Sequence, residues 1–381
     1  VNDWSLKAQN AITAGRSPAS SEYLLALVHA AMYDAAVAIE GQYRPFRIAA
    51  DVMHPASPEA AVAAAAYYVL RFRLPALEPA LTAEYAAYLS TLPDGPEKDN
   101  GTAAGTAVAL AWLELRAGDR FDNTVVYEQP PQAPGVWEPT APTPPVDVKL
   151  AQVVPYVMRS ADRFRPQGPR PLKSRSYAKA FEEVYDLGRL DSLTRTPEQL
   201  EVARFWAEHT AVQWNRNLRQ LAAAAQLDFA GTARMLAMVH VASADAVVGC
   251  FDTKYHFLSW RPVHAIQRAD TDANPWTVPD PSWAALLNVN HPEYPSAHAC
   301  WTTAVTDTLA SFFGTDTVEF SLDSSVTGTV RHYSRFSEVA REVGDARVWA
   351  GLHFRFSVTD GDRIGRRVAR LVTRHFRPSR D

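Results

Sequence analysis

Apolar residues recur at helical spacing along most of this chain. In residues 21–39 they fall on one side of a helix, at Leu24, Leu27, Val28, Ala31, Ala35 and Ile39. The same periodicity predicts further helices over about 58–72, 79–92, 98–117, 174–188, 197–214, 218–229, 232–254 and 296–313. Strand-like alternation is weak and confined to the stretch near 318–330. The pattern therefore predicts an all-α fold built from packed helix bundles.

The helical pattern stops between Asp119 and Pro171, where eleven of the chain's 27 prolines lie. Proline fixes φ and removes a donor, so no long helix is expected there. The segment keeps aromatic residues such as Trp137 and Tyr156, which favours an ordered arm over a disordered linker. We expect an N-terminal helical bundle over 1–118, a proline-rich arm or linker over 119–171, and a C-terminal helical bundle over 172–381.

Composition narrows the classes of function. A chain of 381 residues with 47% hydrophobic content can bury a large core. A formal charge of −4 gives no reason to expect a nucleic-acid partner. No apolar run approaches the length of a membrane span, so none is predicted. The chain begins at Val1 rather than Met, which is compatible with a removed signal peptide and hence with a secreted or periplasmic location, or with a shortened chain.

Cysteine usage excludes a disulfide-rich scaffold. Cys250 and Cys300 are the two cysteines of the chain, which leaves at most one disulfide bridge. We expect both to be small buried thiols.

The most informative stretch is His291-Pro-Glu-Tyr-Pro-Ser-Ala-His298, which directly precedes the helix predicted from Ser296 to Phe313. Ser296 and His298 would lie in the first turn of that helix. Free backbone N–H groups and the positive end of the helix dipole favour an anion there. An alternative is a proline-marked helix start with Ser296 as a simple N-cap.

Two further groups carry matching chemistry. Lys254 and Arg261 are seven residues apart, which on one helix places both on the same side, and aromatic neighbours leave little polar surface. A bound anion is a credible counter-ion for the pair, and a solvated face is the alternative. Arg347 and His353 would lie on different sides of one helix, but Gly351 offers a break that lets them converge.

In this order, Lys-x6-Arg-Pro, Pro-Ser-x-His and Arg-x5-His resemble the vanadium-dependent haloperoxidase and type 2 phosphatidic acid phosphatase superfamily. The phrases around them are similar to its bacterial haloperoxidase-like branch. The resemblance spans about residues 245–372, and it implies an all-α vanadium haloperoxidase-like fold.

The resemblance implies a vanadate cofactor, whose site phosphate can also occupy. It assigns vanadate binding to six residues: Lys254, Arg261, Ser296, Ala297, Arg347 and His353. His353 would be the metal ligand. His298 would be the acid–base group, with His291 and Lys254 as further catalytic residues. The implied partners are hydrogen peroxide, a halide and a small organic substrate, and the alanine-rich helices would suit a homodimer.

Three positions depart from the commonest form of these motifs. Ala297 stands where glycine is usual and Ala346 where serine is common. Ser357 stands where phosphatases carry the aspartate that orients the histidine four residues earlier. Among nearby acids, Asp345, Asp360 or Asp252 could substitute for that aspartate.

Several functions remain open from the sequence. The first is a vanadate-dependent haloperoxidase, with bromide favoured over chloride because His291 matches the histidine typical of bromoperoxidases in the family. The second is an acid phosphatase or diphosphate-processing enzyme that forms a phosphohistidine at His353. A non-oxidative homologue that rearranges or cyclises a natural product is a third, and a non-catalytic oxyanion-binding protein a fourth.

Overall fold

The computed structural model describes residues 1–376 of the chain. The chain divides into two compact units, each assembled from separate stretches of sequence. The first unit comprises residues 1–119 and 211–244 together with the C-terminal end from Arg370. The second comprises residues 120–210 and 245–369. The three-segment division predicted along the sequence remains a prediction.

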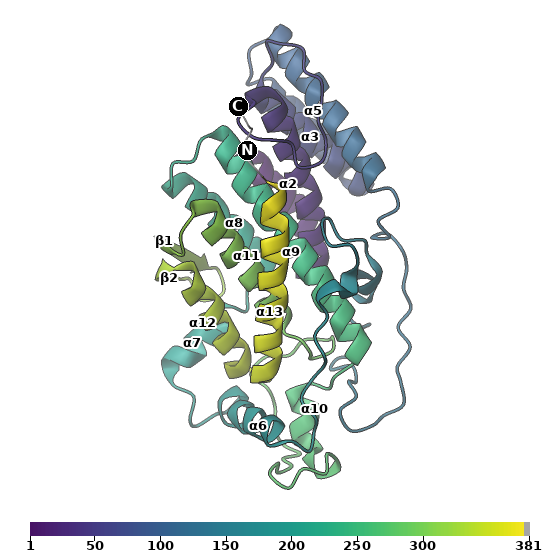
Figure 1. Cartoon of the computed structure of the whole chain (residues 1–381), viewed down its shortest axis with the longest axis vertical. Coiled ribbons are helices and arrows are strands. Elements are labelled where there is room, and N and C mark those ends of the chain that lie inside the picture. Colours follow the sequence, from purple (N-terminus) through teal and green to yellow (C-terminus); the bar gives the residue numbers. More distant parts are fainter. Residues whose placement is uncertain (377–381) are drawn as a thin grey trace. The chain divides into compact units, whose positions relative to one another are not determined.

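The first unit is a helix bundle rich in alanine. Its helices are α1 (Asn2–Thr13), α2 (Pro18–Glu40), α3 (Pro58–Arg73), α4 (Glu78–Leu89) and α5 (Pro96–Leu115), with the short η1 (Pro75–Leu77), nearly all of α8 (Thr210–Ala224) and the start of α9 (Phe229–Phe257). Helix α3 lies between α2 and α5 (Figure 1) and buries every alanine from Ala60 to Ala66. Small side chains allow this close helix packing.

Two polar residues of α2 are buried and bonded within the first unit. Asp34 is fully buried and accepts hydrogen bonds from the backbone N–H of Ile48 at 3.0 Å and from the indole of Trp112 at 2.9 Å. His29 is also buried and lies 3.0 Å from the hydroxyl of Ser5.

The second unit is also mainly helical and contains one antiparallel hairpin. Its elements are η2 (Val148–Gln152), η3 (Ala161–Phe164), α6 (Arg175–Gly188), α7 (Pro197–Phe205), the end of α9, α10 (Pro262–Gln267), η4 (Ala269–Thr271), α11 (Ala297–Phe313), β1 (Thr317–Ser324), β2 (Thr329–Arg335), α12 (Phe336–Trp349) and most of α13 (Arg355–Val372). The short η5 (Thr373–His375) follows α13. Phe320 pairs with Tyr333 in the hairpin, where the sequence alternates weakly. The predicted all-α class is confirmed.

Two predicted helices have the wrong boundaries. The stretch 197–214 is not one helix, because α7 ends at Phe205 and α8 begins at Thr210. Tertiary contacts hold this break: the carbonyl of Trp206 accepts from Arg347, and its indole donates to Glu342. The predicted helix over 218–229 instead belongs to α8 up to Ala224, after which a turn with positive φ intervenes before α9.

Helices α2 and α9 are long and apolar enough to cross a membrane by length and composition. The expectation that no apolar run approaches this length was therefore wrong. Their apolar character coincides with burial inside the protein, at 89% and 94% of the relevant windows. A third candidate arises only if the bent stretch over α3, η1 and α4 is counted as one span.

Residues of the proline-rich segment pack against the rest of the second unit. Its residue Trp137 is fully buried, and the backbone N–H of Trp137 donates to the carbonyl of Leu258 at 2.6 Å. Further along, Asn290 accepts from the N–H of Thr140 at 2.9 Å and donates to the carbonyl of Thr143 at 2.7 Å. Because Asn290 directly precedes His291, these hydrogen bonds hold the start of the stretch from His291 to His298 against the arm.

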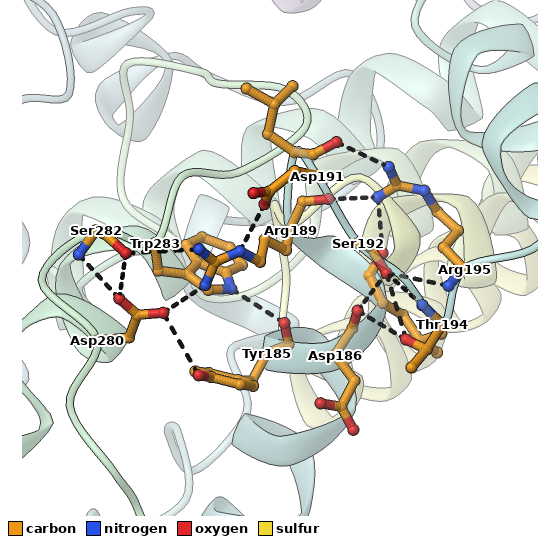
Figure 2. Close-up of polar contacts among 12 residues, drawn as sticks. Tyr185, Asp186, Arg189, Asp191, Ser192, Thr194, Arg195, Asp280, Ser282 and Trp283 are labelled. Carbon is orange, nitrogen blue, oxygen red and sulfur yellow. Dashed lines mark hydrogen bonds and ion pairs between the residues drawn. The ribbon is translucent and has the colours of Figure 1, made fainter.

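The end of α6 is fastened to two loops of the second unit (Figure 2). Arg189 lies between Asp191 and Asp280, and the indole of Trp283 donates to the carbonyl of Tyr185 at 3.0 Å. The guanidinium of Arg195 donates to the carbonyls of Leu187, Arg189 and Trp349, at 2.8, 2.8 and 3.1 Å. These bonds satisfy backbone groups that a helix end leaves unpaired, and they hold the turn that follows α12.

Candidate active site at the start of helix α11

The predicted helix start at Ser296 is present. Ser296 is the N-cap of α11, and its hydroxyl accepts from the N–H of Ala299 at 3.4 Å. The hydroxyl keeps its own hydrogen for donation to a ligand. Helix α11 ends at Phe313, as predicted, and its C-cap Gly314 adopts the left-handed conformation.

Ala297 opens the first turn without strain. It is the first residue of α11 and does not belong to the residues with positive φ. The N–H groups of Ala299 and Cys300 already bond Ser296, which leaves those of Ala297 and His298 able to donate to an anion. Glycine is therefore not required at this position for its conformation.

Lys254 and Arg261 do not share one helix, which corrects the prediction. Helix α9 ends at Phe257, and Leu258 has a φ of 48°. Arg261 follows in extended backbone as the N-cap of α10. The intervening residues instead pair with the arm, through an isolated bridge between Val136 and Ser259. Both cations nevertheless reach the same loop, the one formed by residues 291–295.

The ammonium of Lys254 holds this loop from within. It is fully buried and donates to the carbonyls of Pro292, Glu293 and Pro295 at 2.8, 2.9 and 2.5 Å. An ammonium has three hydrogens, so all of its donors are engaged. Lys254 thus fixes the loop and supplies a buried positive charge.

Arg261 connects the loop to two of the histidines. Its Nε donates to the carbonyl of His291 at 2.8 Å, and one terminal nitrogen donates to Nδ1 of the same ring at 2.8 Å. The other terminal nitrogen donates to the carbonyl of Leu352 at 2.8 Å and lies 3.3 Å from Nε2 of His353. A guanidinium cannot accept, so both ring nitrogens facing it carry lone pairs.

Gly351 separates Arg347 from His353, as the sequence predicted. Arg347 lies in the last turn of α12, Gly351 has a φ of 75°, and His353 lies between α12 and α13. A Cβ at Gly351 would come within 2.5 Å of the carbonyl oxygen of Gly188. Only glycine satisfies both the left-handed conformation and this close approach.

Glu293 orients His353, a role that no pattern in the sequence predicted. Glu293 is 1% exposed, and its Oε1 accepts from Nδ1 of His353 at 3.0 Å. Its Oε2 accepts from the hydroxyl of Ser357 at 2.7 Å. Ser357 thus holds the carboxylate that contacts His353.

The three acids considered as substitutes all have other partners, so that expectation was wrong. Asp345 pairs with Arg355, and Asp252 pairs with Arg165. Asp360 accepts from the hydroxyl of Tyr294 and from Arg363. Glu293 lies within the stretch from His291 to His298, but no sequence spacing relates it to His353, which is 60 positions later.

The site has an excess of buried positive charge. Lys254, Arg261 and Arg347 are at most 3% exposed, and Glu293 is the carboxylate that contacts this group. Burial lowers the pKa of Lys254 to about 7, of Arg347 to about 9 and of Arg261 to about 10. The charge of Glu293 opposes this lowering at Lys254 and Arg261, whereas the charge of Arg261 adds to it at Arg347. Burial also raises the pKa of Glu293 to about 7. A bound anion would relieve the repulsion among these cations.

The three histidines are neutral in this environment. Burial, followed by the nearby cations, lowers the pKa of His291, His298 and His353 well below 6.5. His298 is half-buried, and its Nε2 lies 3.1 Å from the hydroxyl of Thr210, the first residue of α8. Thr210 had no recognisable signal in the sequence, because the helix break before it was not predicted.

The donors fit an oxyanion. The buried Nε of Arg347 has no hydrogen-bond partner, while its terminal nitrogen donates to the carbonyl of Trp206 at 3.1 Å. Within residues 1–376, no cluster of three or more histidine, cysteine or acidic residues is arranged to hold a metal ion. One histidine with a lone pair, three cations and a helix N-terminus instead suit a metal that arrives as an oxyanion.

Cys250 and Cys300 flank the site as buried free thiols, as predicted. The sulfur of Cys250 lies 3.8 Å from the carbonyl of Pro295. Cys250 therefore packs against the loop of residues 291–295.

Comparisons with known proteins show what this chain is similar to. Residues 234–380 match the model of a family described as the VCPO second helical-bundle domain. No curated protein matches the chain in sequence.

Solved structures share the fold over almost the whole chain. The crystal structure of a bacterial vanadium-dependent iodoperoxidase matches with a TM-score of 0.82 and 23% identity, covering 100% of this chain and 98% of that one. The holo form of a bacterial vanadium-dependent chloroperoxidase gives 0.75 and 16%, covering 94% and 92%. The apo form gives 0.74 and 16%, with 93% of each chain covered.

Proposed function

We propose that this chain is a vanadate-dependent haloperoxidase. It has the vanadium haloperoxidase fold, and its residues 234–380 match the model of the second helical-bundle domain. Its reaction would be the oxidation of a halide by hydrogen peroxide, followed by halogenation of a small organic substrate. The relatives with known structures are described as iodo- and chloroperoxidases, which supports the reaction class.

One observation carries the proposal: the state of His353. Its Nδ1–H is held by Glu293 at 3.0 Å, so the lone pair of Nε2 faces the guanidinium of Arg261 at 3.3 Å. Histidines that ligate metals characteristically donate their other ring N–H to a carboxylate. Nε2 of His353 is therefore the atom that we assign as the ligand of vanadium.

The surrounding residues would hold the oxygens of the cofactor. Arg347 offers a buried Nε without a partner, Ser296 offers its hydroxyl hydrogen, and Ala297 offers its backbone N–H. Arg261 and Lys254 would contribute positive charge, and Lys254 would also keep the loop of residues 291–295 in place. Bound vanadate would supply a Lewis-acid centre at which peroxide is activated toward halide. Phosphate, which has the same shape and charge, would compete for this site.

We assign the proton transfer to His298. Its imidazole lies in the first turn of α11 and is oriented by Thr210 at 3.1 Å. The cations that now lower its pKa would be partly neutralised by a bound anion, so its pKa would rise toward the range useful for acid–base catalysis.

We further propose bromide over chloride. His291 is half-buried, and its ring lies 5.3 Å from that of Phe251, with Nδ1 held by Arg261. Its Nε2–H is therefore available to a halide or to peroxide. Replacement by phenylalanine should shift the ratio of bromide to chloride turnover toward chloride.

The test is bromination of an organic dye by protein incubated with vanadate, peroxide and bromide. We expect activity in the wild type and its loss in His353→Ala. The matched control is His332→Ala, because His332 lies on the exposed hairpin, where it bonds Ser321. No vanadate-dependent bromination in the wild type would overturn the proposal.

A second candidate, a phosphatase that forms a phosphohistidine, is favoured by the contact between Glu293 and His353. This carboxylate supplies the orienting acid that Ser357 alone could not provide. Hydrolysis of a phosphate ester that requires His353 and is inhibited by vanadate would support this candidate.

A further inference from the structure

One pocket in the second unit is lined by four arginines. It lies between the end of the proline-rich arm and α13, with a volume of about 370 Å³. The arginines are Arg165, Arg170, Arg363 and Arg367, and one carboxylate, that of Asp360, also lines it. None of the residues assigned above to vanadate lines this pocket.

Two of the arginines are held by carboxylates. Arg165 makes a bidentate pair with Asp252, with both N–O distances at 2.8 Å. Arg363 donates to Asp360 at 2.5 Å, and the other oxygen of Asp360 accepts from the hydroxyl of Tyr294 at 2.8 Å. These contacts fix the positions of two guanidinium groups at the pocket wall.

The other two arginines have no counter-ion. Within residues 1–376, neither Arg170 nor Arg367 has an ion-pair or hydrogen-bond partner. The pocket therefore carries two positive charges more than the carboxylates that touch it, in a chain whose formal net charge is −4. Both side chains are exposed, and an anion bound in the pocket would be the counter-ion that they lack.

The arm is built into this wall. Gly168 has a φ of 125°, and a Cβ there would come within 2.9 Å of the ring of Phe257. The φ of 125° strains any residue other than glycine, and a larger residue would also have to displace the ring of Phe257.

The residues that line the pocket indicate the class of ligand that it would bind. Guanidinium forks match the oxygens of phosphate, and two unpaired forks match a dianion. The volume is within the range of about 300–1,000 Å³ typical of small-molecule pockets, so it exceeds the needs of phosphate alone. Phe164 and Ile364 add apolar surface for an organic group.

We propose that this pocket binds a small organic molecule that carries a phosphate or phosphonate group. Arg170 and Arg367 hold the dianion, Arg165 and Arg363 form the charged walls, and the organic group lies against Phe164 and Ile364. The site is separate from the oxyanion site at α11 and does not depend on the proposed haloperoxidase function.

The test is calorimetric titration of the full chain with phenylphosphonate, a dianion that phosphatases do not hydrolyse. We expect the double variant Arg170→Ala/Arg367→Ala to lose one binding site, its affinity falling about tenfold or more. The matched control is Arg159→Ala/Arg366→Ala, which removes one exposed arginine from the arm and one from α13 outside the pocket. Bromination by the vanadate-loaded protein should be unchanged in both double variants.

Three outcomes would overturn the proposal. The first is equal binding in the two double variants, and the second is an equal loss in both, which would indicate non-specific attraction by charge. The third is sedimentation with phosphatidic acid vesicles through Arg170 and Arg367 without binding of phenylphosphonate, which would assign the same chemistry to a lipid surface. A chain that binds phenylphosphonate through these arginines but does not brominate would retain the pocket and lose the proposed function.

Discussion

The carboxylate of Glu293 accepts a hydrogen bond from Nδ1 of His353 at 3.0 Å, and the two residues are both 1% exposed. The same oxygen accepts from the N–H of Phe354 at 3.0 Å. Glu293 thereby fixes both the tautomer of His353 and the backbone next to it. The lone pair of Nε2 is directed into the oxyanion site as a result.

Glu293→Gln should lower vanadate affinity by about 10–100-fold, the range typical when a partner of a metal-ligating histidine is lost. The amide keeps the size of the side chain but no longer holds Nδ1–H with a full charge. Titration with vanadate, followed by bromination, measures the effect. Asp345→Asn is the control, because Asp345 pairs with Arg355 and not with the histidine. Equal affinity in Glu293→Gln and wild type would refute this role.

Gly351→Ala should destabilise the protein and reduce bromination together. The alanine would have to adopt a φ of 75°, and its methyl group would lie 2.5 Å from the carbonyl oxygen of Gly188. We expect a loss of about 1–3 kcal/mol in the free energy of unfolding from the strained conformation alone, with the clash adding to it. Denaturant unfolding measures this.

Gly314→Ala separates the two causes. Gly314 has a φ of 73°, and a methyl group added there would meet no atom within 4 Å, so this variant carries the strain without the clash. A loss in Gly314→Ala as large as that in Gly351→Ala would show that the close approach at Gly351 contributes nothing.

Ala297→Gly should leave vanadate affinity nearly unchanged. Ala297 has ordinary helical backbone, so glycine gains no conformation that the site needs. The helix would lose up to about 1 kcal/mol of stability, because glycine is more flexible when unfolded. Vanadate titration and thermal unfolding of the same sample test both parts. A large gain in affinity would mean that the methyl group obstructs the oxyanion.

Asp280→Asn should change how stability depends on pH. Hydrogen bonds from Ser282 and the guanidinium of Arg189 (Figure 2) lower the pKa of Asp280 to about 2. A carboxylate with a depressed pKa stabilises the folded state above its unfolded pKa, 3.8 here, and that contribution is lost as pH falls toward 2.

The wild type should therefore exceed Asp280→Asn by on the order of 1 kcal/mol at pH 7, since the site is partly solvated. This difference should shrink as the pH falls from about 4 to about 2. Urea unfolding of both proteins across this range measures it. A difference that is constant with pH would contradict the lowered pKa.

The sequence predicted the fold class because helical periodicity is a local pattern, and it indicated the candidate residues near α11 because they match motifs of a known superfamily. Helical periodicity identified most helices, and Ser296, Gly314 and Gly351 mark where helices end or begin. The relation of Lys254 to Arg261 was not predictable from their spacing. Leu258 adopts a positive φ, and the identity of a leucine does not predict this conformation. The next residue, Ser259, pairs with Val136 of the arm, more than 120 positions earlier.

Glu293 shows a second limit of the sequence. Its contacts to His353 and Ser357 join residues 60 and 64 positions apart, and no periodicity relates such positions. The break between α7 and α8 has the same origin. Arg347 donates a hydrogen bond to the carbonyl of Trp206, 141 positions earlier, and this contact forms only in the folded chain.

The most direct measurement compares peroxidase and phosphatase turnover in one preparation, with and without vanadate. The wild type should brominate only after vanadate is added, phosphate should compete with the activation, and His353→Ala should abolish it. Hydrolysis of a phosphate ester that vanadate inhibits, with no bromination at any vanadate concentration, would contradict the haloperoxidase assignment.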